Sequence, residues 1–232
     1  MAQPLPRLVL LPGLGVGEGL FGKQKSLPVR VEFPQILTPR QEESFAAYAA
    51  RLAKTIDPTP PLYLGGVSFG AMLAMEMAKE LNAAGVFSLS GATNKSQISP
   101  IIRILALLAS GMPRALFPLA QKVTPAFLRI LGRWDRQERH FLLDVFETVN
   151  FELARWGAVR IMEWRAPAGI PCPMYWIHGE IDHVVPVKAV PADAIVLGGG
   201  HFFNVSHPDA TNAFITERIL ADMRVHSGAA AL

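Results

Sequence analysis

Apolar positions along the chain fall into two patterns, short continuous runs and longer stretches with helical spacing. The short runs are rich in β-branched and aromatic residues and are bounded by turn residues, which predicts buried strands. Strands and helices alternate in most of the chain, so we expect an α/β fold with a mostly parallel sheet of about six strands flanked by helices. The expected strands are Arg7–Leu11, Val29–Phe33, Leu62–Val67, Val86–Ser90, Met174–Ile177 and Ala194–Leu197, and the expected helices outside the central region are Glu42–Ile56, Phe69–Leu81 and Pro208–Met223.

The alternation stops in the middle of the chain, where only helical patterns occur, separated by proline and glycine. These helices are expected at Ile101–Ala109, Arg114–Lys122, Pro125–Leu131, Arg136–Val149 and Phe151–Glu163. We therefore expect an all-helical insertion at residues 99–165 between the fourth and fifth strands. Residues 1–98 and 166–225 would form the core, and residues 226–232 a flexible tail.

A serine flanked by glycines joins the third expected strand to the next helix. In Gly66-Val67-Ser68-Phe69-Gly70, glycines lie two residues before and two residues after the serine, which leaves room for a very tight turn. Such a turn holds the Ser68 hydroxyl out of the sheet beside the first amides of the helix, which favour negative charge. The motif is short, and an ordinary strand-to-helix turn would explain it equally well on its own.

A hydrolase built on this turn needs an acid and then a histidine later in the chain. Asp182 follows the expected strand Met174–Ile177, in a loop where its carboxylate could reach a histidine ring. His201 follows the last expected strand and three glycines, Gly198–Gly200, which could swing the imidazole over the sheet edge. His201 would take the proton of Ser68, and Asp182 would hold the ring in the required tautomer.

Other histidines lie near these segments. We expect His178 to be a structural residue at a strand end and His207 to lie at a helix start or on the surface. His183 is expected to be a solvated loop residue, with the mouth of a pocket as the alternative. A metal site formed by His178, Asp182 and His183 is not expected, because neighbouring residues of an extended chain point apart and no further ligand cluster is present.

The chain resembles the α/β-hydrolase superfamily over nearly its whole length. The resemblance rests on Leu11-Pro12-Gly13-Leu14-Gly15, Gly66-Val67-Ser68-Phe69-Gly70, His178-Gly179-Glu180-Ile181-Asp182 and Gly200-His201. It implies an α/β-hydrolase fold whose helical insertion is a cap, with Ser68, Asp182 and His201 as the catalytic residues. It also implies an oxyanion hole made by the backbone N–H groups of Leu14 and Phe69. Many relatives have His-Gly where this chain has Pro12-Gly13, a departure that leaves the amide geometry possible.

An apolar cap over a catalytic serine favours acyl transfer to water through an acyl-serine intermediate. We therefore expect a serine hydrolase that cleaves a carboxylic ester or thioester with a small apolar acyl group. From the apolar residues of the insertion, Leu108, Met112, Phe117 and Phe146 are expected to bind the substrate. The wider set of candidates also includes Leu107, Leu116, Phe127 and Phe141.

Other functions stay open on the same fold. Arg129, Arg133 and Arg136 would share one face if the helix continued past Gly132, and they could then meet an acyl carrier protein or the phosphate of acyl-CoA. The alternative is a solvated face on which these arginines pair with nearby acids. An acyl-carrier or acyl-CoA thioesterase, a cofactor-free lyase or oxygenase, and a ligand receptor therefore remain alternatives.

Composition excludes several other classes. Of the 232 residues, 50% are hydrophobic and 18% are charged, which predicts a folded enzyme domain rather than a disordered chain. The net charge is only +3 and the basic residues are spread, so we expect no nucleic-acid partner. The single cysteine, Cys172, excludes an internal disulfide.

No cofactor is expected either. The stretch Gly17–Gly22 matches a dinucleotide-binding pattern, but it begins several residues after its strand and places Glu18 where a pyrophosphate would lie. The apolar run Ile101–Ala109 is too short to span a membrane, so we expect no stable membrane insertion. No targeting segment is recognised, and a cytoplasmic location is expected. The oligomeric state is not predicted.

Overall fold

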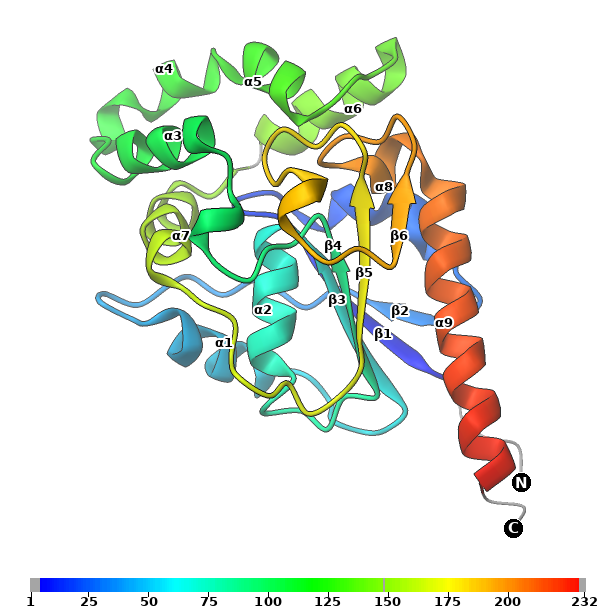
Figure 1. Ribbon diagram of the computed structural model, residues 1–232. Coiled ribbons are helices and arrows are strands. Elements are labelled where there is room, and N and C mark those ends of the chain that lie inside the picture. Colours follow the sequence, from blue (N-terminus) through cyan, green and yellow to red (C-terminus); the bar gives the residue numbers. More distant parts are fainter. Residues whose placement is uncertain (1–4, 148, 230–232) are drawn as a thin grey trace.

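One parallel sheet organises the molecule. The computed structural model describes residues 5–147 and 149–229, and within these ranges six strands form a sheet in the order β2-β1-β3-β4-β5-β6, with every neighbouring pair parallel (Figure 1). The predicted sheet is therefore confirmed. The strands are β1 (Arg7–Leu11), β2 (Arg30–Glu32), β3 (Leu62–Val67), β4 (Gly85–Leu89), β5 (Met174–Gly179) and β6 (Ala194–Val196).

The central strands are apolar because helices cover both of their faces. Every residue of β1, β3 and β4 is buried. The edge strand β2 is shorter than predicted and has only partly buried or exposed residues, as is usual where one side of a strand meets solvent. Strand β4 ends at Leu89 because the next residue, Ser90, has a φ of 51° and leaves the extended conformation.

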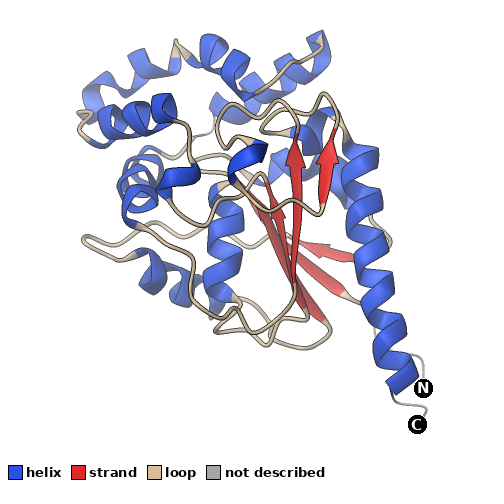
Figure 2. Cartoon of the chain, viewed as in Figure 1, coloured by secondary structure: helices blue, strands red, loops and turns tan. Residues whose placement is uncertain are grey.

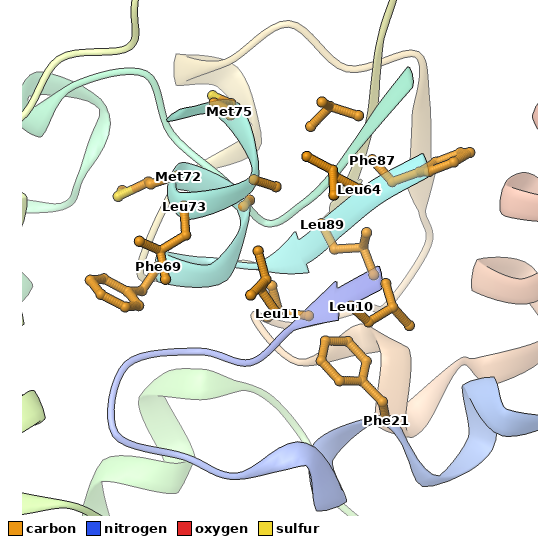
Figure 3. Close-up of a cluster of buried hydrophobic side chains, with 14 of the residues drawn as sticks. Leu10, Leu11, Phe21, Leu64, Phe69, Met72, Leu73, Met75, Phe87 and Leu89 are labelled. Atoms are coloured by element: carbon orange, nitrogen blue, oxygen red, sulfur yellow. The ribbon is translucent and has the colours of Figure 1, made fainter. Parts of the chain in front are cut away.

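Helices flank the sheet on both faces (Figure 2). Helix α1 (Phe45–Ala53) packs on α2 (Phe69–Met77), which lies against the central strands, and α9 (Pro208–Ala229) packs on β5. Figure 3 shows apolar side chains of α2 and the central strands packed together, with Phe21 of the 3₁₀ segment Glu18–Ser26 nearby. This burial holds α2, and therefore the serine at its start, against the end of β3.

The segment between β4 and β5 forms helices joined by loops in its described residues, without a strand of the sheet, and its helices α3 to α6 lie beyond the carboxyl ends of the strands (Figure 1). The predicted helix at 114–122 is broken into a 3₁₀ turn and α4. Helix α5 ends at Leu131 and α6 begins at Arg136, so the condition for one basic face at Arg129, Arg133 and Arg136, a helix that continues past Gly132, is not met. The helices are α3 (Pro100–Ser110), α4 (Phe117–Gln121), α5 (Thr124–Leu131), α6 (Arg136–Glu147) and α7 (Phe151–Glu163), with the short α8 (Phe203–Ser206) later in the chain.

The C-terminal end of the chain continues as helix further than the sequence predicted. Helix α9 reaches Ala229 and so enters the segment 226–232 that was expected to be a tail, while residues 230–232 lie outside the described residues. In the part of the chain that the structure describes, no helix is both long and apolar enough to cross a membrane.

Candidate active site

Ser68 lies at the junction of β3 and α2, in a backbone conformation that is unusual for a residue with a side chain. Its φ is 57° and its ψ is −115°, and its N–H donates to the Leu89 carbonyl of the neighbouring strand at 2.8 Å. Glycines are required on both sides of the turn. A Cβ at Gly66 would lie 2.7 Å from the Leu11 carbonyl oxygen, and a Cβ at Gly70 would lie 2.6 Å from the Pro12 carbonyl oxygen. The sequence therefore forces the tight turn that exposes the Ser68 hydroxyl.

Backbone amides without partners lie next to this serine. The chain leaves β1 for β2 on one side and returns through β3 on the other, so a crevice opens between the ends of β1 and β3. The loop after β1 brings Leu14 to this crevice, and α2 begins there with Phe69. Within residues 5–147 and 149–229, the N–H groups of Leu14 and Phe69 donate to no protein acceptor. In the described chain both N–H groups therefore keep an unused hydrogen bond.

Helix α7 holds the loop that carries Leu14. A Cβ at Gly157 would overlap a methyl group of the Leu14 side chain, and Gly15, with a φ of +76°, lies against Val149 and Ala154. Only a small residue at position 157 lets the helix approach the loop this closely. The helical segment therefore contributes to the position of the Leu14 amide.

Asp182 is buried in the loop that follows β5, with 4% of its surface exposed. Its Oδ1 accepts hydrogen bonds from the N–H groups of Val184 and Val185 at 2.8 and 2.9 Å. Its Oδ2 lies 2.8 Å from His201 Nδ1. Burial by itself would raise the pKa of Asp182, but the charge of His201 and the hydrogen bonds from His178 and His201 outweigh it and lower the pKa well below its usual range. Asp182 is therefore ionised at neutral pH.

His201 is oriented by this carboxylate. A carboxylate only accepts hydrogen bonds, so Nδ1 of His201 carries a proton toward Asp182, and Nε2 of the neutral ring is left as a base. The backbone of His201 is also held, because its N–H donates to the Leu131 carbonyl at the end of α5 at 2.6 Å. A Cβ at Gly200 would lie 2.5 Å from the Cα of Gly132, so the backbone of the loop Gly198–Gly200 lies directly against the backbone that follows α5.

His178 supports the acid from the other side. Its side chain is fully buried at the end of β5, and its Nε2 lies 2.7 Å from the Val185 carbonyl oxygen and 3.3 Å from Asp182 Oδ2. A carbonyl oxygen only accepts, so Nε2 is the protonated nitrogen. The structural role predicted for His178 thus takes the form of a contact with Asp182.

The other two histidines take no part in this contact. His183 is exposed, and the carbonyl oxygen of His207 accepts hydrogen bonds from Thr211 at the start of α9.

Ser68 and His201 line one cavity of about 200 Å³, which also reaches Leu14. In the described part of the chain, the Ser68 hydroxyl has no hydrogen-bond partner, including His201. All other lining side chains are apolar or glycine: Gly13, Leu14, Met72, Ile98, Ile102, Ala106, Phe127, Leu131, Phe146, Ala158, Ile161, Met162, Val184, Val185 and Phe202.

The structure separates the residues that were expected to bind substrate. Phe146 lines the cavity, and so does Phe127 from the wider set of candidates. The positions of the others correct the prediction. Leu108 is 64% exposed on the outer side of α3, Met112 lies outside the lining, and Phe117 packs on Phe151 with ring centroids 4.9 Å apart. The hydrophobic effect is non-directional, so an apolar residue in the sequence can line a pocket, pack on another helix or stay at the surface, and the sequence did not show which of these applies to each residue.

Several lining residues were not predicted, although the sequence contained a signal for some of them. Met72 lies four residues after Ser68, which is one helical turn, and therefore faces the same way. Val184 and Val185 come two and three residues after Asp182, and Phe202 directly follows His201. Ile102 and Ile161 carry no such signal, because only the packing of α3 against α7 brings them to the cavity, and Ile98 lies in the turn just before α3.

Other parts of the described chain offer less chemistry. No group of three or more His, Cys, Asp or Glu side chains with the arrangement of a metal site occurs among the described residues. A larger hollow of about 450 Å³ lies between the 3₁₀ segment Glu18–Ser26 and α6, remote from Ser68, and its polar residues include Lys23 and Glu138. Glu138 is already engaged with the Asp135 N–H at 3.0 Å. The smaller cavity is the one lined by both Ser68 and His201.

Solved structures of other proteins share this fold. Among solved structures, the fold is similar to an esterase from Thermogutta terrifontis, with a TM-score of 0.71 and 17% identity, covering 96% of this chain and 92% of that chain. It is similar to an esterase from Exiguobacterium antarcticum, with a TM-score of 0.76 and 11% identity, covering 94% and 93%. It is also similar to the enol-lactonase from Burkholderia xenovorans LB400, with a TM-score of 0.72 and 18% identity, covering 94% and 92%.

At these identities the structural likeness establishes the fold only. A search of curated proteins found no match. The sequence model of the alpha/beta hydrolase family, however, matches residues 8–214, which is most of the chain. The resemblance predicted from the sequence motifs is thus confirmed, and this chain belongs to the alpha/beta hydrolase family.

Proposed function

We propose that this α/β-fold hydrolase cleaves carboxylic esters of small, neutral, apolar acyl groups through an acyl-serine intermediate. One observation carries the proposal. A carboxylate-oriented histidine and a serine on a strained turn line the same apolar cavity, beside backbone amides that have no partner in the described chain. These are the groups that acyl transfer requires.

In this proposal each group has a role in the first half of the reaction. His201 Nε2 accepts the proton of the Ser68 hydroxyl as Ser68 Oγ forms a bond to the carbonyl carbon of the ester. The negative charge on the former carbonyl oxygen is stabilised by the N–H groups of Leu14 and Phe69, each worth about 3 kcal/mol. When the bond to the leaving oxygen breaks, His201 returns the proton to that oxygen, and the alcohol departs.

The second half repeats the same steps with water. His201 removes a proton from a water molecule, whose oxygen attacks the acyl carbon, and the bond to Ser68 Oγ breaks with return of the proton to the serine. Asp182 keeps its negative charge throughout and stabilises the imidazolium that forms in each step. Its buried, multiply hydrogen-bonded position suits this role, because no rearrangement is needed when the charge appears.

The cavity supports the substrate class. Apart from Ser68 and His201, its lining has no polar side chain, so a charged acyl group would lose its hydration without gaining a partner. A volume of about 200 Å³ favours a short acyl chain. In this proposal the helices α3–α7 act as a cap, because Ile102, Phe127 and Phe146 from them close the cavity over Ser68. The comparison structures named as esterases agree with an ester as substrate.

The test is a panel of p-nitrophenyl esters with graded acyl length, together with acyl thioesters of the same chains. We expect turnover of short neutral esters, a fall in kcat/KM for longer chains and for chains ending in a carboxylate, and a loss of at least about 10³-fold in Ser68→Ala. Ser26→Ala, which removes an exposed hydroxyl bonded to the Lys23 carbonyl, is the matched control and should behave as wild type. If Ser68→Ala kept more than a few per cent of wild-type activity, Ser68 would not be the nucleophile. A preference for thioesters over esters would change the assigned leaving group.

A further inference from the structure

Helix α3 has apolar residues on the side that faces solvent as well as on the side that faces the cavity. Ile102 and Ala106, one turn apart, line the cavity above Ser68. Ile101, Ile104 and Leu108 follow the opposite side of the helix at helical spacing and are exposed. No residue of α3 is buried, although most of the helix is apolar. The helix therefore separates the cavity from an apolar outer surface.

The exposed apolar residues continue after α3. We call this set the apolar ridge, and its members are between 39% and 70% exposed: Ile101, Ile104, Leu105, Leu107, Leu108, Leu116, Leu119 and Val123. Figure 1 shows α3 and α4, which carry most of them, at the outer edge of the helical segment, away from the sheet. Exposed large apolar residues concentrated in one stretch indicate a surface that binds something apolar, because a freely soluble surface disperses them.

The charges of the same stretch have one sign. Residues 99–134 contain Arg103, Arg114, Lys122, Arg129 and Arg133 and no aspartate or glutamate. Lys122, Arg129 and Arg133 are exposed, and Arg114 is 81% exposed with Glu152 of α7 at 3.6 Å. Helical segments that combine exposed apolar side chains with Lys and Arg bind at the interface of anionic membranes, where the cations meet lipid headgroups.

We propose that the apolar ridge docks on an anionic lipid surface, lying in the interface without crossing it. A second copy of this chain fits less well, because a symmetric contact would bring the basic stretches of both copies together. A lipid surface also adapts to protruding side chains, whereas a rigid protein partner would need a groove matched to each of them. Docking would place α3 between the lipid and the cavity, on the side from which an apolar ester would arrive.

The experiment measures binding of the full chain to vesicles by co-sedimentation, so it does not depend on turnover and is independent of the proposed ester hydrolysis. The vesicles are phosphatidylcholine alone, or phosphatidylcholine with phosphatidylglycerol. We expect binding to the anionic vesicles that is stronger than to the neutral ones and falls as salt is raised. The double variant Leu107→Ser/Leu108→Ser should bind at least about tenfold more weakly.

The matched control is Leu197→Ser/Leu220→Ser, which removes two exposed leucines outside the ridge, 75% and 45% exposed. It should bind as wild type does, and circular dichroism should show that both double variants are folded. The proposal is overturned if wild type does not sediment with anionic vesicles, or if the control weakens binding as much as the ridge variant. A concentration-dependent dimer that the ridge variant abolishes, without vesicle binding, would assign the ridge to a second copy instead.

Discussion

Replacing Asp182 by asparagine tests how the acid controls the histidine. The substitution keeps the size of the side chain but removes one acceptor and adds an N–H₂ group. The N–H groups of Val184 and Val185 both point at Oδ1 of Asp182, at 2.8 and 2.9 Å, so the single oxygen of asparagine is held on that side. Its N–H₂ group then faces Nδ1 of His201 in place of the carboxylate oxygen that lies 2.8 Å away.

The consequence is a change of tautomer. Two donors cannot share this contact, so His201 must accept at Nδ1 and carry its proton on Nε2, where it cannot take the proton of Ser68. The negative charge that stabilises the imidazolium is lost as well. We expect kcat for a short p-nitrophenyl ester to fall about 10⁴-fold, which is about 5 kcal/mol of transition-state free energy.

The assay compares kcat and KM of wild type and Asp182→Asn between pH 6 and pH 9, with Asp193→Asn as the control. Asp193 is an exposed carboxylate that also accepts a backbone hydrogen bond, from the Trp176 N–H at 2.7 Å, but it lies outside the cavity lining. We expect the control to retain activity and KM of Asp182→Asn to change little, because the loss concerns the chemical step. A drop of less than tenfold in kcat would refute the role assigned to Asp182.

Two further predictions concern the turn and acid stability. Gly70→Ala should lower the free energy of unfolding by about 1–3 kcal/mol and impair hydrolysis, because the added Cβ would overlap the Leu11 carbonyl. Gly22→Ala is the control and should have little effect, because a Cβ there meets nothing within 4 Å. Urea unfolding and ester hydrolysis are measured for both variants, and equal behaviour of the two would contradict the packing argument. The pKa of Asp182 is lowered in the folded state, so its contribution to stability is present above the unfolded pKa of about 3.9 and is lost as the pH falls further. The stability difference between wild type and Asp182→Asn should therefore shrink below about pH 4, and a difference that stays constant down to pH 2 in urea titrations would contradict it.

The positions of Ser68, Asp182 and His201 at one edge of the sheet could be predicted because each residue is tied to a local signal at the end of a strand. Ser68 follows an apolar run and lies between glycines, Asp182 follows another run, and His201 follows a third. In a parallel sheet the carboxyl ends of the strands lie at one edge, so residues that are distant along the chain meet there. The contact between Asp182 and His201 in the structure has this origin.

The pocket and the outer surface could not be predicted in the same way. Ile102 and Leu108 belong to one apolar helix, yet the first lines the cavity and the second is 64% exposed. The sequence shows that both are apolar, but the hydrophobic effect has no direction, and helix α3 can bury either side. Which side faces the cavity depends on its packing against α7, which joins residues far apart in the chain.

The amino-acid sequence by itself determined the alternation of strands and helices, the tight turn at Ser68 and the order of acid and histidine, because steric limits at glycine and the burial of continuous apolar runs act over a few residues. Only the tertiary structure decided that the end of α5 bonds to the backbone of His201 and that His178 contacts Asp182. These contacts join residues of separate elements. In a close-packed interior the position of each element depends on all of its neighbours, so such contacts cannot be derived from a local stretch of sequence.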